Sequence, residues 1–188
     1  MRIGLFGGTF NPPHTGHRII AEQAFDALSL DRLIWMPAAR SPFKDGAADV
    51  SAAHRLTMSL LAASDHDGFT VSDEEIRREP PSYTVDTVRA LANRFSESEL
   101  ILLIGGDSWH DFDRWREPEG IRAMARIAVY PRPGSDTDLE GADHVLDSPR
   151  IDVSSTEIRQ RLAQGKTVAG LIDRGVLAYI RKHRLYGT

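Results

Sequence analysis

The chain has 188 residues, a formal net charge of −4 and no cysteine, with a sequence pI near 6.0. This length suits one domain, which we expect to span residues 1–188, and the lack of cysteine excludes a disulfide framework, a thiolate metal site and a cysteine nucleophile. The slightly acidic balance excludes a broad basic face for nucleic acid, so small phosphorylated ligands are the expected anionic partners.

No targeting or membrane segment is evident in the sequence. The amino terminus enters a strand at once, and no run approaches the roughly 18 apolar residues that a membrane helix requires. We therefore expect a cytoplasmic protein without a membrane partner. No feature of the sequence specifies an oligomeric state.

The first segment reads as a strand, a glycine loop and a helix. Residues 3–6 are apolar, and residues 18–28 are compatible with a helix. Gly7 and Gly8 lack a β-carbon, so the backbone there can approach a ligand closely, and the positive end of the following helix favours an anion. The segment therefore predicts a phosphate site.

Two histidines lie where this helix should begin. His14 and His17 are three residues apart, so both can face one ligand if the first helical turn is formed. A single histidine near a helix start is more often structural than catalytic. The combination of both histidines with the glycine loop makes them candidates for the chemistry.

Strands and helices alternate through the middle of the chain. Strands are predicted over 32–36, 69–76, 100–104, 127–130 and 144–146; helices are predicted over 51–64 and from Ser82 or Thr84, as the cap, to about 95. In the helix over 51–64, Leu56, Leu60, Leu61 and Ala63 recur at helical spacing. Residues 37–46, 131–134 and 135–143 read as loops.

A second ligand-binding edge follows the most apolar strand, 100–104. Gly105 to Ser108 is predicted as a glycine turn at the carboxyl end of that strand, where ligands of open α/β sheets bind. Asp107 fits a ribose contact there.

Two helices are predicted at the end of the sequence. Ser154 and Glu157 form a capping-box pattern, Ile158 and Leu162 supply an apolar stripe, and a second amphipathic helix is expected over 171–182. The alternation of elements predicts an α/β fold, a doubly wound Rossmann-like parallel sheet with C-terminal helices.

Two nucleotide motifs are excluded by spacing. Gly165-Lys166-Thr167 resembles the end of a P-loop, but Gln160 stands where that motif needs a glycine, so a turn between helices is the better interpretation. Gly4, Gly7 and Gly8 do not have the glycine-x-glycine-x-x-glycine spacing of a dinucleotide site.

Residues 7–17, Gly-Gly-Thr-Phe-Asn-Pro-Pro-His-Thr-Gly-His, resemble the signature of the nucleotidyltransferase superfamily of adenylyl- and cytidylyltransferases. In that superfamily the histidine-x-glycine-histidine element holds nucleotide phosphates. Asn11 stands where aspartate is more common.

Residues 153–159 resemble the second signature, isoleucine-serine-serine-threonine-x-isoleucine-arginine, with Val153 in place of isoleucine; spacing alone would indicate only a well-capped helix. In the superfamily the serines of this signature and the helix N–H groups hold the outer phosphates of ATP, and backbone groups nearby recognise the adenine base. The two resemblances imply ATP-binding positions at Gly7, Gly8, Thr9, Phe10, Gly105, Asp107, Ser154, Ser155, Thr156 and Ile158.

Residues 81–87, Pro-Ser-Tyr-Thr-Val-Asp-Thr, are similar to the segment of bacterial nicotinate mononucleotide adenylyltransferases that contacts the nicotinate end of the acceptor. Residues 106–108, Trp115 and residues 132–134 match the same family in order and approximate spacing. The resemblance implies acceptor contacts from Ser82, Tyr83, Thr84, Trp115 and Arg132, with the Trp115 ring on the pyridine. Two departures are Phe43 before Lys44, where the family has histidine, and Arg116 after Trp115, where an aromatic is common.

The implied activity is transfer of AMP from ATP to nicotinate mononucleotide. The resemblance assigns catalytic roles to His14, His17, Lys44 and Arg159, and Mg²⁺ is expected to be bound through the substrate phosphates rather than by a carboxylate cluster. The alternatives are an adenylyltransferase for phosphopantetheine or for the amidated mononucleotide, and a non-catalytic nucleotide-binding regulator.

Overall fold

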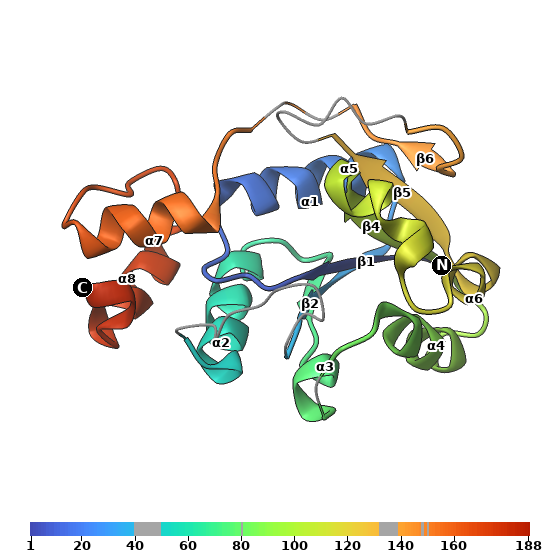
Figure 1. Ribbon diagram of the computed structural model, residues 1–188, viewed down its shortest axis with the longest axis horizontal. Coiled ribbons are helices and arrows are strands. Elements are labelled where there is room, and N and C mark those ends of the chain that lie inside the picture. Colours follow the sequence, from blue (N-terminus) through green and yellow to red (C-terminus); the bar gives the residue numbers. More distant parts are fainter. Residues whose placement is uncertain (40–49, 80, 132–138, 148, 150) are drawn as a thin grey trace.

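The computed structural model describes residues 1–39, 50–79, 81–131, 139–147, 149 and 151–188, and within these ranges six strands form one parallel sheet (Figure 1). The strand order is β3-β2-β1-β4-β5-β6. The strands are β1 (Arg2–Gly8), β2 (Arg32–Pro37), β3 (Phe69–Val71), β4 (Glu99–Gly105), β5 (Arg126–Tyr130) and β6 (His144–Val145). All five neighbouring pairs are parallel, which confirms the predicted Rossmann-like sheet.

Helices cover both faces of the sheet, which confirms the doubly wound prediction. The helices are α1 (Thr15–Ala27), α2 (Ala52–Ala63), α3 (Glu74–Arg77), α4 (Thr84–Arg94), α5 (Gly106–His110), α6 (Pro118–Met124), α7 (Ser155–Ala163) and α8 (Arg174–Lys182), with 3₁₀ turns η1 (Phe112–Arg114) and η2 (Leu185–Gly187). One core lies between the sheet and α1, α2, α7 and α8. The other core lies between the sheet and α4, α5, η1 and α6.

Alternation along the central strands sends side chains to the two cores. Leu5 of β1 is in register with Ile34 of β2 and Leu102 of β4, and all three belong to the core beneath α4 to α6. Phe6 and Trp35, the next pair along, point into the opposite core. Strands buried on both faces read as continuous apolar runs, which explains why they were readily predicted.

The neighbours β1 and β4 mark the point where the strand order reverses. From β1 the chain proceeds to β2 and β3, and from β4 it proceeds to β5 and β6 on the other side. In an open parallel sheet the loops that leave such neighbours run in opposite directions, so a crevice forms at the carboxyl ends of the two strands. The segments predicted to bind phosphate and ribose both leave the sheet here.

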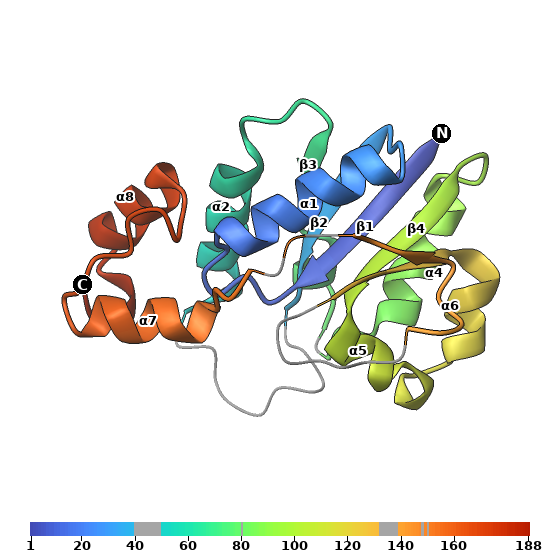
Figure 2. The same cartoon turned by 90° about the horizontal axis from the view of Figure 1, so that it is seen from above.

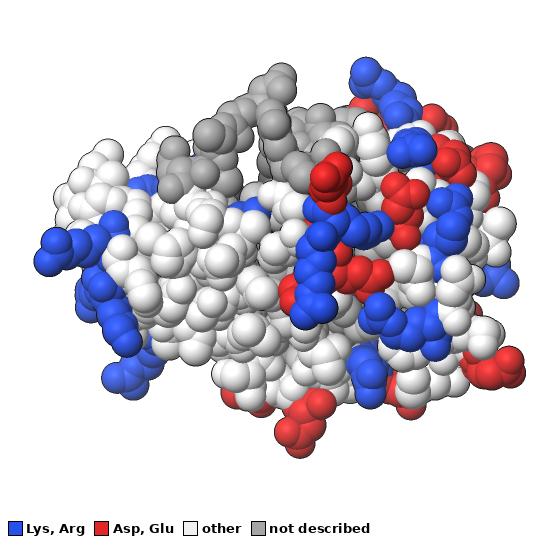
Figure 3. Space-filling model, turned by 90° about the horizontal axis from the view of Figure 1, so that it is seen from below, with Lys and Arg blue, Asp and Glu red and all other residues white. Residues whose placement is uncertain are grey.

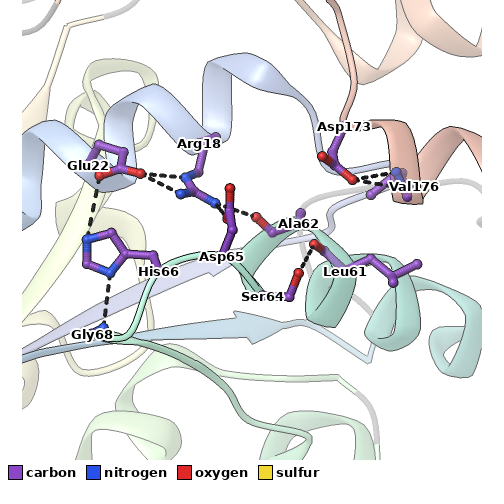
Figure 4. Close-up of polar contacts among 11 residues, drawn as sticks. Arg18, Glu22, Leu61, Ala62, Ser64, Asp65, His66, Gly68, Asp173 and Val176 are labelled. Atoms are coloured by element: carbon purple, nitrogen blue, oxygen red, sulfur yellow. Dashed lines mark hydrogen bonds and ion pairs between the residues drawn. The ribbon is translucent and has the colours of Figure 1, made fainter.

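Arg18 fixes α1 onto the end of α2 (Figure 4). Its guanidinium donates to Glu22 at 2.7 Å, to the Ala62 carbonyl at 3.0 Å and to Asp65. His66 lies 3.6 Å from the Glu22 carboxylate through Nε2, and its Nδ1 accepts the Gly68 amide at 3.0 Å. These contacts hold the helix that carries His14 and His17 at a fixed position over β2.

Two predictions between residues 69 and 95 were wrong. The strand predicted to reach residue 76 ends at Val71, because the Ser72 hydroxyl accepts the Glu74 amide at 3.3 Å and α3 begins there. Neither Ser82 nor Thr84 caps α4, whose N-cap is Tyr83 without a side-chain cap. The Ser82 hydroxyl instead accepts the Ala39 amide at 3.3 Å.

The buried face of α2 carries a charged side chain. Leu60 is 49% exposed, whereas Arg55, Met58, Ser59, Ala62 and Ala63 form the buried stripe. The helix therefore directs an arginine, Arg55, toward the core, which the positions of the apolar residues alone do not predict.

Other boundaries differ by a few residues. Helix α1 begins at Thr15 instead of residue 18, and α8 begins at Arg174 because Asp173 caps it through the Gly175 and Val176 amides. β4 passes directly into α5 without the predicted glycine turn, and α6 was not predicted. No described helix is both long enough and apolar enough to span a membrane.

Candidate active site

The loop between β1 and α1 has its carbonyl groups bonded to donors from distant elements. The carbonyls of Gly8, Thr9, Asn11 and Pro12 accept hydrogen bonds from the Ala38 amide at 2.9 Å, the Arg55 guanidinium at 2.8 Å, the Arg159 guanidinium at 2.9 Å and the Ser155 hydroxyl at 2.8 Å. A loop whose carbonyls are directed at the protein can turn its N–H groups toward an anion, as in other backbone anion sites.

The side chains of Phe10 and Asn11 fix the conformation of this loop by contacts within the protein. Phe10 has a left-handed φ of 48° and is 1% exposed, with its ring against Phe6 and His17 at centroid distances of 5.6 and 5.0 Å. The Asn11 side-chain oxygen accepts the Tyr186 hydroxyl at 2.6 Å. The Phe10 side chain therefore belongs to the core, and only its backbone is left for the predicted contact with ATP.

The two histidines form one unit at the start of α1. His14 is the N-cap, and its backbone amide donates to Nδ1 of His17 at 3.1 Å. The imidazole rings lie 3.7 Å apart, centroid to centroid. Because Nδ1 of His17 accepts a hydrogen bond, the proton of its neutral ring resides on Nε2, which is thereby a donor.

Helix α7 begins beside the start of α1, as two perpendicular views show (Figures 1 and 2). Ser154 caps α7 by accepting the Glu157 amide at 3.1 Å, which confirms the predicted N-cap. Ser155 and Arg159 donate to the loop carbonyls of Pro12 and Asn11. Two helix N-termini and the histidines thus converge on one short loop, an arrangement that favours a polyanion.

The remaining α7 positions serve the helix. Thr156 accepts a second hydrogen bond from Arg159, at 3.2 Å. Ile158 is 0% exposed and packs in the core, and its amide is bonded to the Ser154 carbonyl at 3.1 Å. Its side chain and amide are therefore both committed to the protein.

Positive charge gathers at the end of the molecule formed by α7 and α8. Residues 155–188 contain seven Lys and Arg but only two acidic side chains, in a chain whose net charge is −4. Figure 3 shows basic side chains without acidic ones at the α8 end of the visible face, whereas the opposite end carries both signs. The resulting local field favours a polyphosphate near α7 without creating a basic protein.

A cavity of about 640 Å³ lies at the carboxyl ends of β1 and β4. From the nucleotide side it is lined by Gly7, Gly8, Thr9, Gly105 and Asp107, and from the other side by Ser82, Tyr83, Thr84 and Trp115. His14, His17 and Arg159 are not among its lining residues; they join it through the loop over residues 8–12. Segments predicted to bind two different substrates therefore line the same cavity.

Glu75, which the sequence reading missed, lies at the floor of the acceptor side. It is 8% exposed and lines the cavity. Burial raises the pKa of its carboxyl above the ordinary value, although hydrogen bonds from Thr87, at 2.7 Å, and from Ser82 act in the opposite direction. Arg78 donates to the same Thr87 hydroxyl. The carboxyl thereby anchors the segment that carries Ser82 to Thr84.

Arg55 was also missed, because it interrupts the apolar stripe of α2. It is 2% exposed and donates to three backbone carbonyls, those of Thr9, Ala38 and Ala39, at 2.8, 2.6 and 2.8 Å. Burial lowers the pKa of its guanidinium, yet the group stays protonated because arginine does so in proteins. A charged residue at the buried end of a helical stripe was the available signal.

Two predicted site residues, Lys44 and Arg132, lie outside the described residues. Tyr83 lies beneath the Arg116 guanidinium, which is 4.8 Å from the ring centroid. No group of three or more His, Cys, Asp or Glu side chains that could hold a metal ion occurs within the ranges that the structure describes.

A nucleotide loop between two helix ends, on a Rossmann-like sheet, defines a nucleotidyltransferase, and residues 5–161 match the family model described as cytidylyltransferase-like. A relative from Thermus thermophilus, named "probable nicotinate-nucleotide adenylyltransferase", is 43% identical over 99% of this chain and 100% of its own length. A relative of the same name from Thermomicrobium roseum is 39% identical, and the match covers 100% of this chain and 92% of the relative. The chain belongs to the nicotinate-nucleotide adenylyltransferase family.

A solved structure has the same fold at much lower identity. Plasmodium falciparum nicotinic acid mononucleotide adenylyltransferase complexed with NaAD superposes with a TM-score of 0.83, covering 98% of this chain and 97% of that one, at 17% identity. The likeness extends over the sheet and both helical layers.

Proposed function

We propose that the protein transfers AMP from ATP to nicotinate mononucleotide, releasing pyrophosphate and forming nicotinate adenine dinucleotide. An oxygen of the acceptor 5′-phosphate attacks the α-phosphorus of ATP, and the bond from that phosphorus to the bridging oxygen of pyrophosphate breaks. The attacking phosphate is already ionised near pH 7, so no general base and no covalent enzyme intermediate is required. We also propose that residues 1–188 form a single domain and that the protein works in the cytoplasm.

The observation that carries this proposal is the position of the loop over residues 8–12. This loop contacts the N-termini of α1 and α7 on one side, and its residues Gly8 and Thr9 line the cavity on the other. A triphosphate held at the helix ends would place its α-phosphorus toward the cavity, where the acceptor phosphate enters. Positioning two ionised groups in line is the main catalytic task, and it supplies much of the rate in phosphoryl and nucleotidyl transfer.

His17 is the proposed donor to the α-phosphate. Its Nδ1 accepts the His14 amide at 3.1 Å, so the neutral ring carries its donor at Nε2, which we assign to the α-phosphate. A fixed donor whose hydrogen bond strengthens as charge develops on the α-phosphate oxygens lowers the barrier selectively.

The β- and γ-phosphates are assigned to His14, Lys44, Arg159 and the start of α7. Arg159 uses two of its N–H groups on Asn11 and Thr156, and a guanidinium has five. The Ser155 hydroxyl donates a hydrogen bond to the Pro12 carbonyl, so we assign Ser155 to positioning the loop. We assign Ser154 and the α7 amides to the phosphates. ATP enters as its magnesium complex, whose metal needs few protein ligands because phosphates and water complete its shell.

The acceptor side is assigned to Ser82, Tyr83, Thr84, Trp115 and Arg132. Trp115 lines the cavity, and we assign its ring to stacking on the pyridine, since aromatic stacking suits a flat heterocycle. Gly105 and Asp107 also line the cavity, and we assign them to the nucleotide, with Asp107 on its ribose. Gly7, Gly8, Thr9 and the Phe10 backbone complete the ATP side.

Pyrophosphate release tests the proposal directly. The protein is incubated with ATP and Mg²⁺ and with nicotinate mononucleotide, nicotinamide mononucleotide or phosphopantetheine at equal concentration. We expect strong preference for the nicotinate acceptor and loss of that activity in His17→Ala. Turnover with another acceptor alone would keep the reaction class and reject the substrate, and tight ATP binding without turnover on any acceptor would favour a nucleotide-binding regulator.

A further inference from the structure

Arg55 is a buried cation without an ionic partner among the described residues. Its side chain is 2% exposed, its Nε has no hydrogen-bond partner in the described structure, and no described carboxylate forms an ion pair with it. Burying a charge without a counter-ion is costly, and an apolar side chain of similar volume would usually stabilise a core as well or better. All the described hydrogen bonds of the Arg55 guanidinium go to backbone carbonyls, so its role is to be sought in the segments that carry them.

The three carbonyls that Arg55 binds belong to two different segments. Thr9 lies in the nucleotide loop, and Ala38 and Ala39 follow β2. The same two segments are also joined by the Ala38 amide, which donates to Gly8 at 2.9 Å. The planar guanidinium can span both because its donors are fixed in a fork, which a lysine ammonium cannot reproduce.

The contacts continue from Ala39 into the acceptor side. The Ala39 amide donates to the Ser82 hydroxyl at 3.3 Å, and Ser82 lines the cavity together with the buried Glu75 carboxyl. A chain of hydrogen bonds thus runs from Thr9 through Arg55 and Ala39 to Ser82. Thr9, Ser82 and Glu75 all line the cavity, as does Ala38, so the chain surrounds the place where the substrates would meet.

We propose that Arg55 is a positioning residue that holds the nucleotide loop and the acceptor segment at a fixed separation, so that the acceptor phosphate meets the α-phosphorus of ATP in line. This inference rests on the proposed adenylyl transfer. Arg55 touches neither substrate; it acts through the carbonyls of Thr9 and Ala39. Misplacement of reacting groups by about 1 Å can cost roughly 100-fold in rate.

The test compares Arg55→Met and Arg55→Lys with a matched arginine at the other end of the sheet. Arg2 donates to the Leu28 carbonyl at 2.5 Å and pairs with Glu99 at 2.9 Å, at the amino-terminal edge of the strands. Arg2→Met therefore removes the same kind of arginine–carbonyl contact far from the cavity. For each variant, kcat and the KM of ATP and of nicotinate mononucleotide are measured below the onset of unfolding, and the thermal midpoint is recorded.

We expect Arg55→Met to lower kcat about 10- to 100-fold and to raise both KM values. Arg55→Lys keeps the charge and should recover part of the loss, whereas Arg2→Met should change neither kcat nor KM by more than about twofold even where it lowers the thermal midpoint. If Arg55→Met does not fold, Arg55→Lys against Arg2→Met decides. Kinetics of the Arg55 variants that match those of Arg2→Met, or an effect confined to the KM of ATP, would overturn the proposal.

The wild-type protein separates this inference from the proposed function. An inactive wild type would reject adenylyl transfer to nicotinate mononucleotide. An active wild type with unimpaired Arg55 variants would reject only the role of Arg55.

Discussion

The backbone amide of His14 donates to Nδ1 of His17 at 3.1 Å, and their rings lie 3.7 Å apart. One hydrogen bond thus both caps α1 and fixes which nitrogen of His17 carries the proton. In the proposed mechanism the helix cap uses Nδ1 of His17 and the substrate contact uses Nε2, so substitution can separate the two roles.

Replacing His17 by asparagine should separate them. The asparagine oxygen can occupy the place of Nδ1 and keep the cap, whereas alanine loses it at a cost of about 1 kcal/mol in the free energy of unfolding. Both variants lose the donor at Nε2, so kcat should fall on the order of 10²- to 10³-fold in each. Urea unfolding and pyrophosphate release measure the two effects. An asparagine variant with kcat within tenfold of wild type would contradict the assignment.

Gly16 is required by the ring of His14. A β-carbon at Gly16 would lie 3.0 Å from Nδ1 and 3.1 Å from Cε1 of that ring. Alanine favours a helix by up to about 1 kcal/mol over glycine, so Gly16→Ala should fold at least as well as wild type while displacing His14 and lowering kcat about tenfold.

Gly175→Ala is the matched control for this change. Gly175 also lies in the first turn of a helix, and its β-carbon would be 3.0 Å from the Asp173 side chain. It should leave kcat unchanged because α8 does not line the cavity. Equal kcat in wild type and Gly16→Ala would show that the His14 ring position is unimportant.

The two glycines that end β1 should respond oppositely to alanine. A β-carbon on Gly7 meets nothing within 4 Å, and Gly7 lines the cavity, so Gly7→Ala should fold normally. Its methyl group would occupy ligand space and weaken substrate binding by about 1–3 kcal/mol. A β-carbon on Gly8 would lie 2.8 Å from the Phe10 ring, so Gly8→Ala should instead lower stability. Denaturant midpoints and substrate titrations distinguish the two, and a folded Gly7→Ala with wild-type affinity would argue against the cavity as the binding site.

Glu75 should make stability depend on pH. Because burial raises its pKa in the folded state, the folded protein binds this proton more tightly than the unfolded chain. Its contribution to the free energy of unfolding therefore falls as pH rises from the ordinary carboxyl pKa of about 4.3 through the raised value. Glu75→Gln removes the charge but keeps the Thr87 contact. It should match wild type below the ordinary carboxyl pKa and exceed it as the pH rises through the raised value, after which the difference stays constant; parallel stability curves would contradict this.

The fold was predictable from the central strands because they are buried on both faces. Ile101 and Leu102 point to opposite cores, so apolar side chains continue without interruption through β4, and this continuous run carries the signal. The strand predicted over 69–76 failed where Ser72 turns the chain by a local hydrogen bond, which competes with strand pairing. The helix predicted over 51–64 is α2, Ala52–Ala63, and it carries Arg55 on its buried face.

The candidate site was predictable where function is carried by contiguous motifs. Gly7 to His17 and Ser154 to Arg159 are local patterns, and the structure brings them together. Glu75 and Tyr186 were not predictable, because each acts through a partner distant in sequence, and Arg55 was marked only by its position among the apolar residues of α2. The backbone carbonyls that Arg55 binds are known only from the tertiary structure.

The donors that fix the nucleotide loop come from the far end of the sequence. Ser155, Arg159 and Tyr186 reach Pro12 and Asn11 across 143, 148 and 175 residues. A chain that ends before residue 155 would contain β1 to β6 and the donors Ala38 and Arg55, but the carbonyls of Asn11 and Pro12 would lack theirs. We therefore expect a truncation at that point to keep the strands of the sheet and to lose the full set of hydrogen bonds that fixes this loop.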